Sequence, residues 1–293
     1  MRIKDAEKIN KSKIKNTYEN FPLWSSIYLK KIMPDLSSLY HFCRTVDDYS
    51  DLPSRVAIKK LSNLESKVEG WYKPNQKISD EYSPLIKTIK KYNLKKEGFQ
   101  KLIDANYKDL SIKRYSTFEE LVSYCKLSAN PVGRFILQIF NQDFPKLYKF
   151  SDEICTALQI VNFLQDISKD YQLGRIYLPA EDLKLFSVKE DDIAYSRCTP
   201  NFKELMRFQS ERCWNMFNNG APLIDQLKGP QKIPISIFIQ SGRKVLNKIK
   251  KIDYETLNNR PTISKFEKIT LVSKSSIKYL FSANLVNYQK YDA

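Results

Sequence analysis

The sequence carries two acidic clusters far apart in the chain, one from Asp47 to Asp51 and one from Asp166 to Asp170. In each cluster two aspartates are four residues apart, a spacing that stacks side chains on one face of an α-helix. Like charges at this spacing repel each other, so a helix that keeps them needs a compensating cation. Hard divalent cations such as Mg²⁺ take carboxylate oxygens and keep room for water and substrate phosphates. The two clusters therefore predict two helices that share a metal and diphosphate site.

The second cluster lies in a predicted helix of residues 149–172. Apolar residues cover most of its circumference, whereas a single polar stripe runs along it: Gln159, Asn162, Asp166 and Asp170. A carboxylate buried without a partner is strongly disfavoured, so this stripe favours a polar-lined cavity over a solvated face. A cation and a hydroxyl follow the stripe closely, and we expect them near the mouth of the site: Arg175 and Tyr177.

The first cluster ends a predicted helix of residues 35–51. Tyr40 and Arg44 are four residues apart, as are Asp47 and Asp51. Acidic side chains in the last turn of a helix oppose its dipole, and they would be unusual in a merely solvated helix end. The mismatch favours a functional role for this cluster.

The rest of the chain also favours helices. Two long runs carry helix-spaced apolar residues that we expect in the core: Ile58, Leu61, Leu64, Val68 and Trp71 in one, and Leu205, Phe208, Cys213, Trp214 and Phe217 in the other. Prolines predict helix ends at many corners, among them Pro34, Pro53, Pro84, Pro131, Pro145, Pro179, Pro200, Pro230 and Pro261. No repeat or long linker divides residues 1–293. The sequence therefore predicts one all-α domain of about ten helices.

The net charge of +16 admits nucleic acid, an anionic membrane surface or an anionic substrate as partner, and solvated lysine-rich helix faces would account for part of it. No nucleic-acid-binding pattern accompanies the lysines, so we expect no nucleic acid.

Other classes of protein are also excluded by the sequence. No stretch approaches the ~18 apolar residues of a spanning helix, which leaves at most peripheral membrane contact. The glycines are too scattered for a dinucleotide or P-loop motif. Five cysteines without a C-x-x-C pair suit a reducing cytoplasm.

With these motifs the sequence resembles the squalene/phytoene synthases, enzymes of the all-α isoprenoid synthase fold. The similarity runs over nearly the whole chain. Within the family the chain is most similar to the bacterial branch that makes hydroxysqualene, and three segments carry that similarity: residues 19–22, residues 124–133, and residues 162–166 followed by 174–179. The resemblance implies one helical bundle around a central cavity.

The resemblance also implies roles for individual residues. The implied Mg²⁺ ligands are Asp47, Asp51, Asp166 and Asp170, with Asp48 and Asn162 in support. The implied substrate-binding residues are Asn20, Tyr40, Arg44, Gln159, Asn162, Arg175, Tyr177 and Arg260. Tyr124 is expected beside the reacting carbons, and it joins the four metal-binding aspartates as a catalytic residue.

The implied reaction converts presqualene diphosphate and water into hydroxysqualene and diphosphate. Three alternatives within the family stay open, namely synthesis of presqualene diphosphate, hydride capture to squalene, and phytoene-type condensation. A non-catalytic scaffold homologue is a further alternative, although it gives no reason for the chain to keep five aspartates in the two motifs.

Overall fold

Helices form all the regular structure in the part of the chain that the computed structural model describes, residues 27–74 and 81–288, and these residues contain no strand. In chain order the elements are α2 (Ile27–Ser50), α3 (Ser54–Trp71), α4 (Ser83–Tyr92), α5 (Lys96–Ser111), α6 (Phe118–Ser128), α7 (Asn130–Ile139), α8 (Pro145–Gln165), α9 (Ile167–Gln172), α10 (Ala180–Leu185), α11 (Glu190–Ala194), α12 (Pro200–Gly220), α13 (Leu223–Gln226), the 3₁₀ turn η1 (Gly229–Gln231), α14 (Lys232–Lys251) and α15 (Lys265–Tyr288). The predicted all-α fold is confirmed. There are more helices than predicted, because short helices such as α9, α10, α11 and α13 fill the corners.

Proline marks several helix starts, as predicted. Pro84, Pro131, Pro145 and Pro200 lie in the first turn of their helices, where the missing N–H has no intrahelical partner to lose. The predicted break at Pro34 is wrong, because this residue lies inside α2. Pro34 is exposed, so its ring displaces no side chain of the core.

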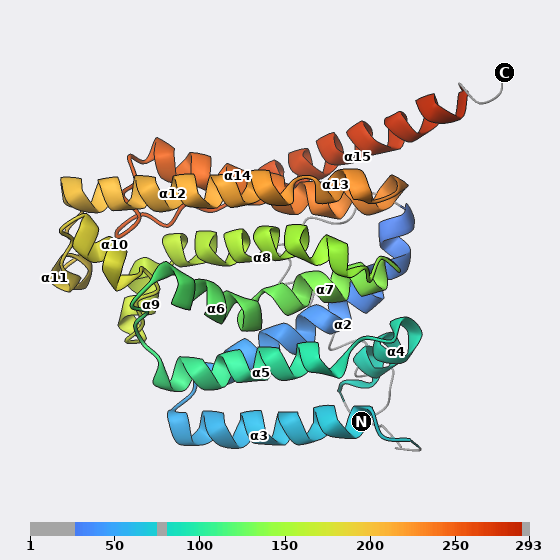
Figure 1. The fold of residues 1–293 in the computed structure, drawn as a ribbon, viewed down its shortest axis with the longest axis horizontal. Coiled ribbons are helices and arrows are strands. Elements are labelled where there is room, and N and C mark those ends of the chain that lie inside the picture. The colour runs from blue at the N-terminus through green and yellow to red at the C-terminus, as the bar shows by residue number, and fades with distance from the viewer. Residues whose placement is uncertain (1–26, 75–80, 289–293) are drawn as a thin grey trace.

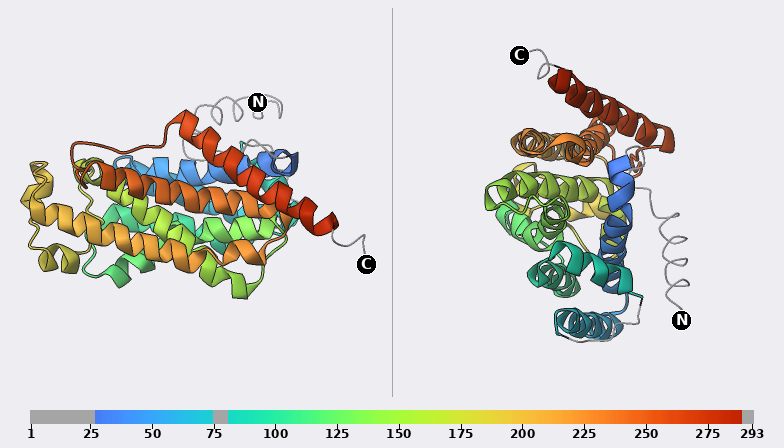
Figure 2. Two further views of the ribbon diagram at one scale, coloured as in Figure 1. Left: turned by 90° about the horizontal axis from the view of Figure 1, so that it is seen from above. Right: turned by 90° about the vertical axis from the view of Figure 1, so that its right-hand side faces the viewer.

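The long helices are stacked in layers, with α8 in the middle (Figure 1). α8 packs against α12 and α14 on one side and against α6 and α7 on the other. α5 then connects α6 and α7 to α2 and α3. α15 lies outermost, against α14 (Figure 2). None of the described helices has the length and apolar character needed to span a membrane.

Apolar periodicity explains why α8 is central. Its buried residues occupy several faces of the helix and include Ile154, Ile160, Val161 and Leu164. At the other end of the stack, Phe42 of α2 meets Phe99 of α5 edge to face, at 5.0 Å between ring centroids.

One predicted core residue is exposed. α3 buries a narrow stripe of Ala57, Leu61, Leu64, Val68 and Trp71. Ile58, predicted to belong to this stripe, is 51% exposed. The small Ala57 takes the inward position, and its neighbour is turned by about 100° around the helix.

Candidate active site

The first acidic cluster lies at the end of α2. Asp47 is accessible to water, yet burial among protein atoms raises its pKa to about 7, and Asp109 and Asp48 add to the increase. Arg44 and a side-chain hydrogen bond from Asn106 partly offset this effect. Arg44 pairs with Asp48 at 2.8 Å. The Asp47 side chain is thus accessible to solvent while nearby protein atoms make its ionised form less favourable.

The second cluster lies where α8 gives way to α9. The predicted helix of residues 149–172 is interrupted, because Asp166 has non-helical backbone angles of φ −109° and ψ 17°. A backbone hydrogen bond of 2.8 Å from Asp170 N to Asp166 O nevertheless keeps the two aspartates one turn apart. Burial and the neighbouring Asp166 raise the pKa of Asp170 to about 7.

Arg175 joins the two clusters. Its backbone N–H donates to Asp170 O at 2.8 Å, while its side chain reaches Asp51 at 3.1 Å and the carbonyl of Ser50 at 3.1 Å. The side chain is only 9% exposed, and its Nε–H has no hydrogen-bond partner. A buried donor without a partner is rare in proteins. Arg175 therefore holds both motifs in one site and keeps a donor for a further ligand.

The segment between α14 and α15 covers the second cluster. Arg260 makes a two-pronged ion pair with Asp166, at 2.5 and 3.0 Å. Gln165 donates to the carbonyl of Pro261 at 2.5 Å, and Ser168 donates to that of Leu257 at 2.5 Å. These contacts place Arg260 beside Asp166 of the second cluster.

Sequence reasoning missed Asp109, a buried carboxylate of α5. The Tyr124 hydroxyl donates to it at 2.7 Å, and the Tyr177 hydroxyl donates at 3.0 Å. Burial raises the pKa of Asp109, although both tyrosines lower it. The available signal was positional, because Asn106 and Asp109 continue the buried stripe of α5 that begins with Phe99 and Leu102. A polar residue at a core position needs a partner.

Tyr177 and Arg175 were both expected near the mouth of the site, and the structure buries both side chains. Tyr177 is buried, because the chain after Arg175 runs along the loop between α5 and α6, where Ile176 N donates to Lys113 O at 2.9 Å. This path turns Tyr177 inward, and its ring stacks on Phe163 at 3.8 Å between centroids.

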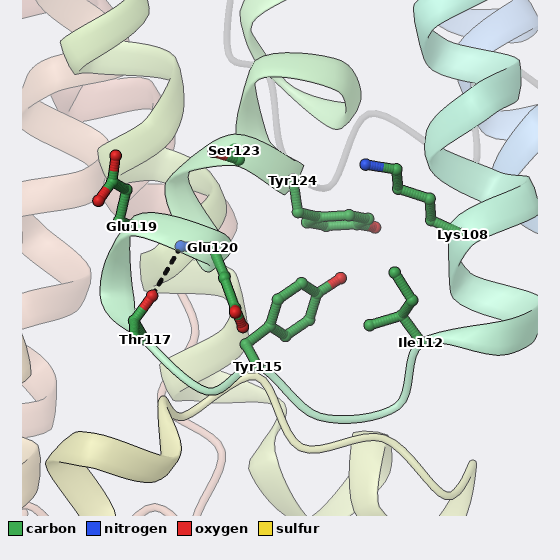
Figure 3. Close-up of a pocket in the computed structure, with 8 residues that line it drawn as sticks. All are labelled: Lys108, Ile112, Tyr115, Thr117, Glu119, Glu120, Ser123 and Tyr124. Carbon is green, nitrogen blue, oxygen red and sulfur yellow. Dashed lines mark hydrogen bonds between the residues drawn. The ribbon is translucent and has the colours of Figure 1, made fainter.

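Tyr124 also borders a cavity whose lining includes none of the aspartates of the two clusters. This cavity of about 460 Å³ is lined from α5, the α5–α6 loop and α6. Figure 3 shows the rings of Tyr115 and Tyr124 together, with both hydroxyls pointing toward Lys108 and Ile112. The Tyr115 hydroxyl is buried and has no partner.

The remaining predicted residues differ in their surroundings. Tyr40 and Gln159 are partly buried, and burial raises the pKa of Tyr40. Asn162 is exposed, so the polar stripe of α8 has one fully accessible member. Asn20 lies outside the described residues.

The donor set fits a hard cation. The aspartates offer only oxygen, and the raised pKa values of Asp47 and Asp170 mean that added positive charge would stabilise their ionised forms. Within the described ranges, no three His, Cys, Asp or Glu side chains are grouped as ready ligands of one ion. A cation here would thus share its coordination between few carboxylates, water and a substrate phosphate, as is usual for Mg²⁺.

Comparison with known proteins assigns the chain to a family. It belongs to the squalene/phytoene synthase family, whose model matches residues 14–267. Members are prenyltransferase-type enzymes of isoprenoid biosynthesis. The resemblance drawn from the sequence is therefore confirmed.

Three relatives illustrate the range of the family. A hydroxysqualene synthase of Zymomonas mobilis is 27% identical over 279 residues, 90% of this chain and 89% of its own length. A hydroxysqualene synthase of Rhodopseudomonas palustris is 29% identical over 72% of each chain. A phytoene synthase of Arthrospira platensis is 27% identical over 82% of each chain. Both names occur at similar identity, so these relatives define the family and not the product.

Two solved structures are similar to this one. The squalene synthase HpnC from Alicyclobacillus acidocaldarius is 31% identical, with a TM-score of 0.78 over 85% of this chain and 95% of its own. A dehydrosqualene synthase in complex with ligand is 21% identical, with a TM-score of 0.83 over 95% of this chain and 98% of its own. The second similarity concerns the fold alone.

The pKa values of Asp47 and Asp170 predict how the effect of Mg²⁺ depends on pH. Both folded-state values, about 7, lie above the ordinary value of 3.8. The metal-free fold therefore loses stability as the pH rises from about 4 through 7, because ionisation becomes unfavourable there. Protons compete with the metal, so the rise in melting temperature caused by Mg²⁺ should be larger near pH 8 than near pH 6. Differential scanning fluorimetry at both pH values measures the rise in melting temperature that Mg²⁺ causes. An equal rise at pH 6 and pH 8 would contradict the prediction.

Proposed function

We propose that this chain converts presqualene diphosphate and water into hydroxysqualene and diphosphate, with Mg²⁺ as the metal. The observation that carries the proposal is the polar group of Asp109, Tyr124 and Tyr177 next to an aromatic wall. The hydroxysqualene synthases among the relatives support the same reaction.

The arginines and aspartates would bind the diphosphate end of the substrate. Asp47, Asp51, Asp166 and Asp170 would hold the metal, with Asp48 and Asn162 in support. Bound Mg²⁺ neutralises charge that develops on a departing diphosphate. Arg175 has a buried Nε–H without a partner, which suits a phosphate oxygen. Arg44, Arg260 and Tyr40 would add further donors.

Aromatic rings would surround the hydrocarbon chain and its cation. Phe163 and Tyr177 lie nearly parallel, at 7°. Tyr124 approaches Tyr177 at 5.7 Å and Phe163 at 6.2 Å between centroids. Ring faces attract positive charge, and an apolar wall excludes stray water. Such a wall suits a carbocation that must survive until one chosen nucleophile reaches it.

The Asp109 group would position that nucleophile. Both tyrosine hydroxyls donate to Asp109, so each oxygen keeps lone pairs that can accept a hydrogen bond. A water that donates to them directs its own lone pair outward, toward the cation. When the new C–O bond forms, the water proton passes through a tyrosine hydroxyl to Asp109. The raised pKa of Asp109 favours this transfer. The products are hydroxysqualene, diphosphate and protonated Asp109.

Oxygen isotope labelling tests the product. With presqualene diphosphate, Mg²⁺ and no nicotinamide, the enzyme should release an alcohol, and in ¹⁸O-water this alcohol should carry the heavy isotope. Mass spectrometry of the extracted product measures both. Tyr124→Phe removes one water partner without removing the ring, so it should divert part of the product to hydrocarbon. An unlabelled product from the wild-type enzyme, or strict dependence on a reduced nicotinamide, would contradict the proposal.

The phytoene synthases among the relatives favour a second candidate, the condensation of two prenyl diphosphates. Incubation with farnesyl or geranylgeranyl diphosphate alone separates the two reactions, because only a condensing enzyme would consume them.

We also propose a cytoplasmic location. All five cysteines are free, which suits a reducing compartment.

A further inference from the structure

The last helix has an inner face that is bound to the bundle. α15 packs against α14 and η1. Val272, Ser275 and Ser276 are buried on this side. The Ser275 hydroxyl accepts a hydrogen bond of 3.1 Å from Gln240 of α14. The orientation of α15 about its own axis is therefore fixed.

The outer face of α15 is apolar. Phe266 is 78% exposed, Ile269 63% and Ile277 59%. Ile269 and Ile277 follow Phe266 by three and eleven residues, a spacing that places all three along one side of the helix. α15 lies at one edge of the bundle, with α3 at the opposite edge (Figures 1 and 2). The fold thus leaves three large apolar side chains of one helix exposed to water, and such side chains favour an interaction surface when they are contiguous.

Positive charge accompanies the stripe. Lys265 and Lys274 are exposed on α15. Glu267 is the only acidic residue in the helix, and it is already neutralised by Lys244 at 3.4 Å and Lys248 at 2.6 Å. The protein as a whole is also strongly positive, with a net charge of +16. A second copy of the chain would bring the same charge to the contact, whereas an anionic partner would complement it.

We propose that the outer face of α15 docks on an anionic lipid bilayer. Phe266, Ile269 and Ile277 would enter the boundary between headgroups and acyl chains, and the lysines would contact lipid phosphates. This combination of an apolar stripe with flanking lysines is how an interfacial helix binds. The segment that precedes α15 carries Arg260, which binds Asp166, so the docking face adjoins the candidate active site in the chain. If the proposed function holds, an apolar product would leave the enzyme close to the membrane that dissolves it.

Vesicle sedimentation tests this inference with the full chain. The wild-type protein should sediment with vesicles of phosphatidylglycerol and phosphatidylcholine, bind pure phosphatidylcholine vesicles much less, and be released by salt. Phe266→Ser/Ile277→Ser and Lys265→Glu/Lys274→Glu should each weaken binding to the anionic vesicles by about ten-fold or more, since each variant removes two contacts. All four side chains are exposed, so the melting temperature should not change.

Leu185→Ser/Tyr195→Ser is the matched control, because these side chains are 67% and 72% exposed at other helix ends. It should bind like wild type. Equal binding to both kinds of vesicle, or undiminished binding by both α15 variants, would overturn the inference. So would a concentration-dependent dimer that Phe266→Ser/Ile277→Ser abolishes while vesicle binding persists. The assay needs no turnover, so its failure would leave the proposed reaction untouched.

Discussion

Asp47→Asn should reduce turnover by at least about 100-fold and at the same time raise the melting temperature of the metal-free protein at pH 8. The first effect follows because even an outer partner of a metal ligand costs about 10–100-fold when it is removed. The second follows because burial raises the pKa of Asp47 to about 7, so its ionised form is unfavourable in the fold. A neutral side chain of the same shape removes that penalty. As a metal ligand, Asp47 would serve activity at the expense of stability.

Two further substitutions sharpen this prediction. Asp170→Asn should behave like Asp47→Asn, because the pKa of Asp170 is raised in the same way. Asp166→Asn should lose turnover without the gain in stability, since its carboxylate already pairs with Arg260. Steady-state kinetics at saturating Mg²⁺ and scanning fluorimetry measure the two effects. Near-wild-type turnover in Asp47→Asn would remove it from the metal site.

Asp182→Ala should destabilise the fold by about 3–5 kcal/mol, the usual cost of removing one partner from a buried ion pair. Asp182 is 3% exposed and accepts from Arg212 at 2.7 Å and from Gln209 at 2.7 Å. The Arg212 guanidinium also lies over the rings of Phe118 and Phe208, at 3.9 and 4.5 Å from their centroids. Without Asp182 this partly buried charge loses its counterion.

Urea denaturation measures the loss as a lower midpoint with an unchanged slope. Glu211→Ala is the matched control on the same helix as Arg212, because its ion pair with Arg207 is 3.6 Å long and open to solvent on both sides. An exposed pair of this kind contributes little, so the control midpoint should not move. If both variants lost stability equally, burial would not be the reason for the effect of Asp182.

The helices could be predicted from the sequence because their signals are local. Apolar residues recur at helical spacing, and proline disfavours every helical position except the first turn. Two of the errors concern Pro34 and Ile58. Pro34 is tolerated inside α2 on an exposed face, and Ile58 lies beside a small residue that took its inward position. Which of two neighbouring residues points inward depends on the partner helix, which sequence spacing alone does not identify.

The site could be predicted only in part. Asp47, Asp51, Asp166 and Asp170 share spacing within each motif, and this spacing was visible. The contact between the Arg175 side chain and Asp51 could not be predicted from the sequence, because this hydrogen bond joins residues 124 positions apart. Asp109 was missed for the same reason, since its partners Tyr124 and Tyr177 come from other elements. Contacts between distant segments depend on helix packing, which periodicity does not specify.

Isothermal titration calorimetry can show directly whether the two acidic clusters form one site for metal and diphosphate. Mg²⁺ would be titrated into the protein with and without farnesyl thiodiphosphate, a diphosphate that resists ionisation. A shared site predicts that each ligand tightens the binding of the other by the same factor, about ten-fold or more. Asp47→Asn and Asp166→Asn, one from each cluster, should each abolish this coupling. Equal Mg²⁺ affinity with and without the analogue would contradict a joint site.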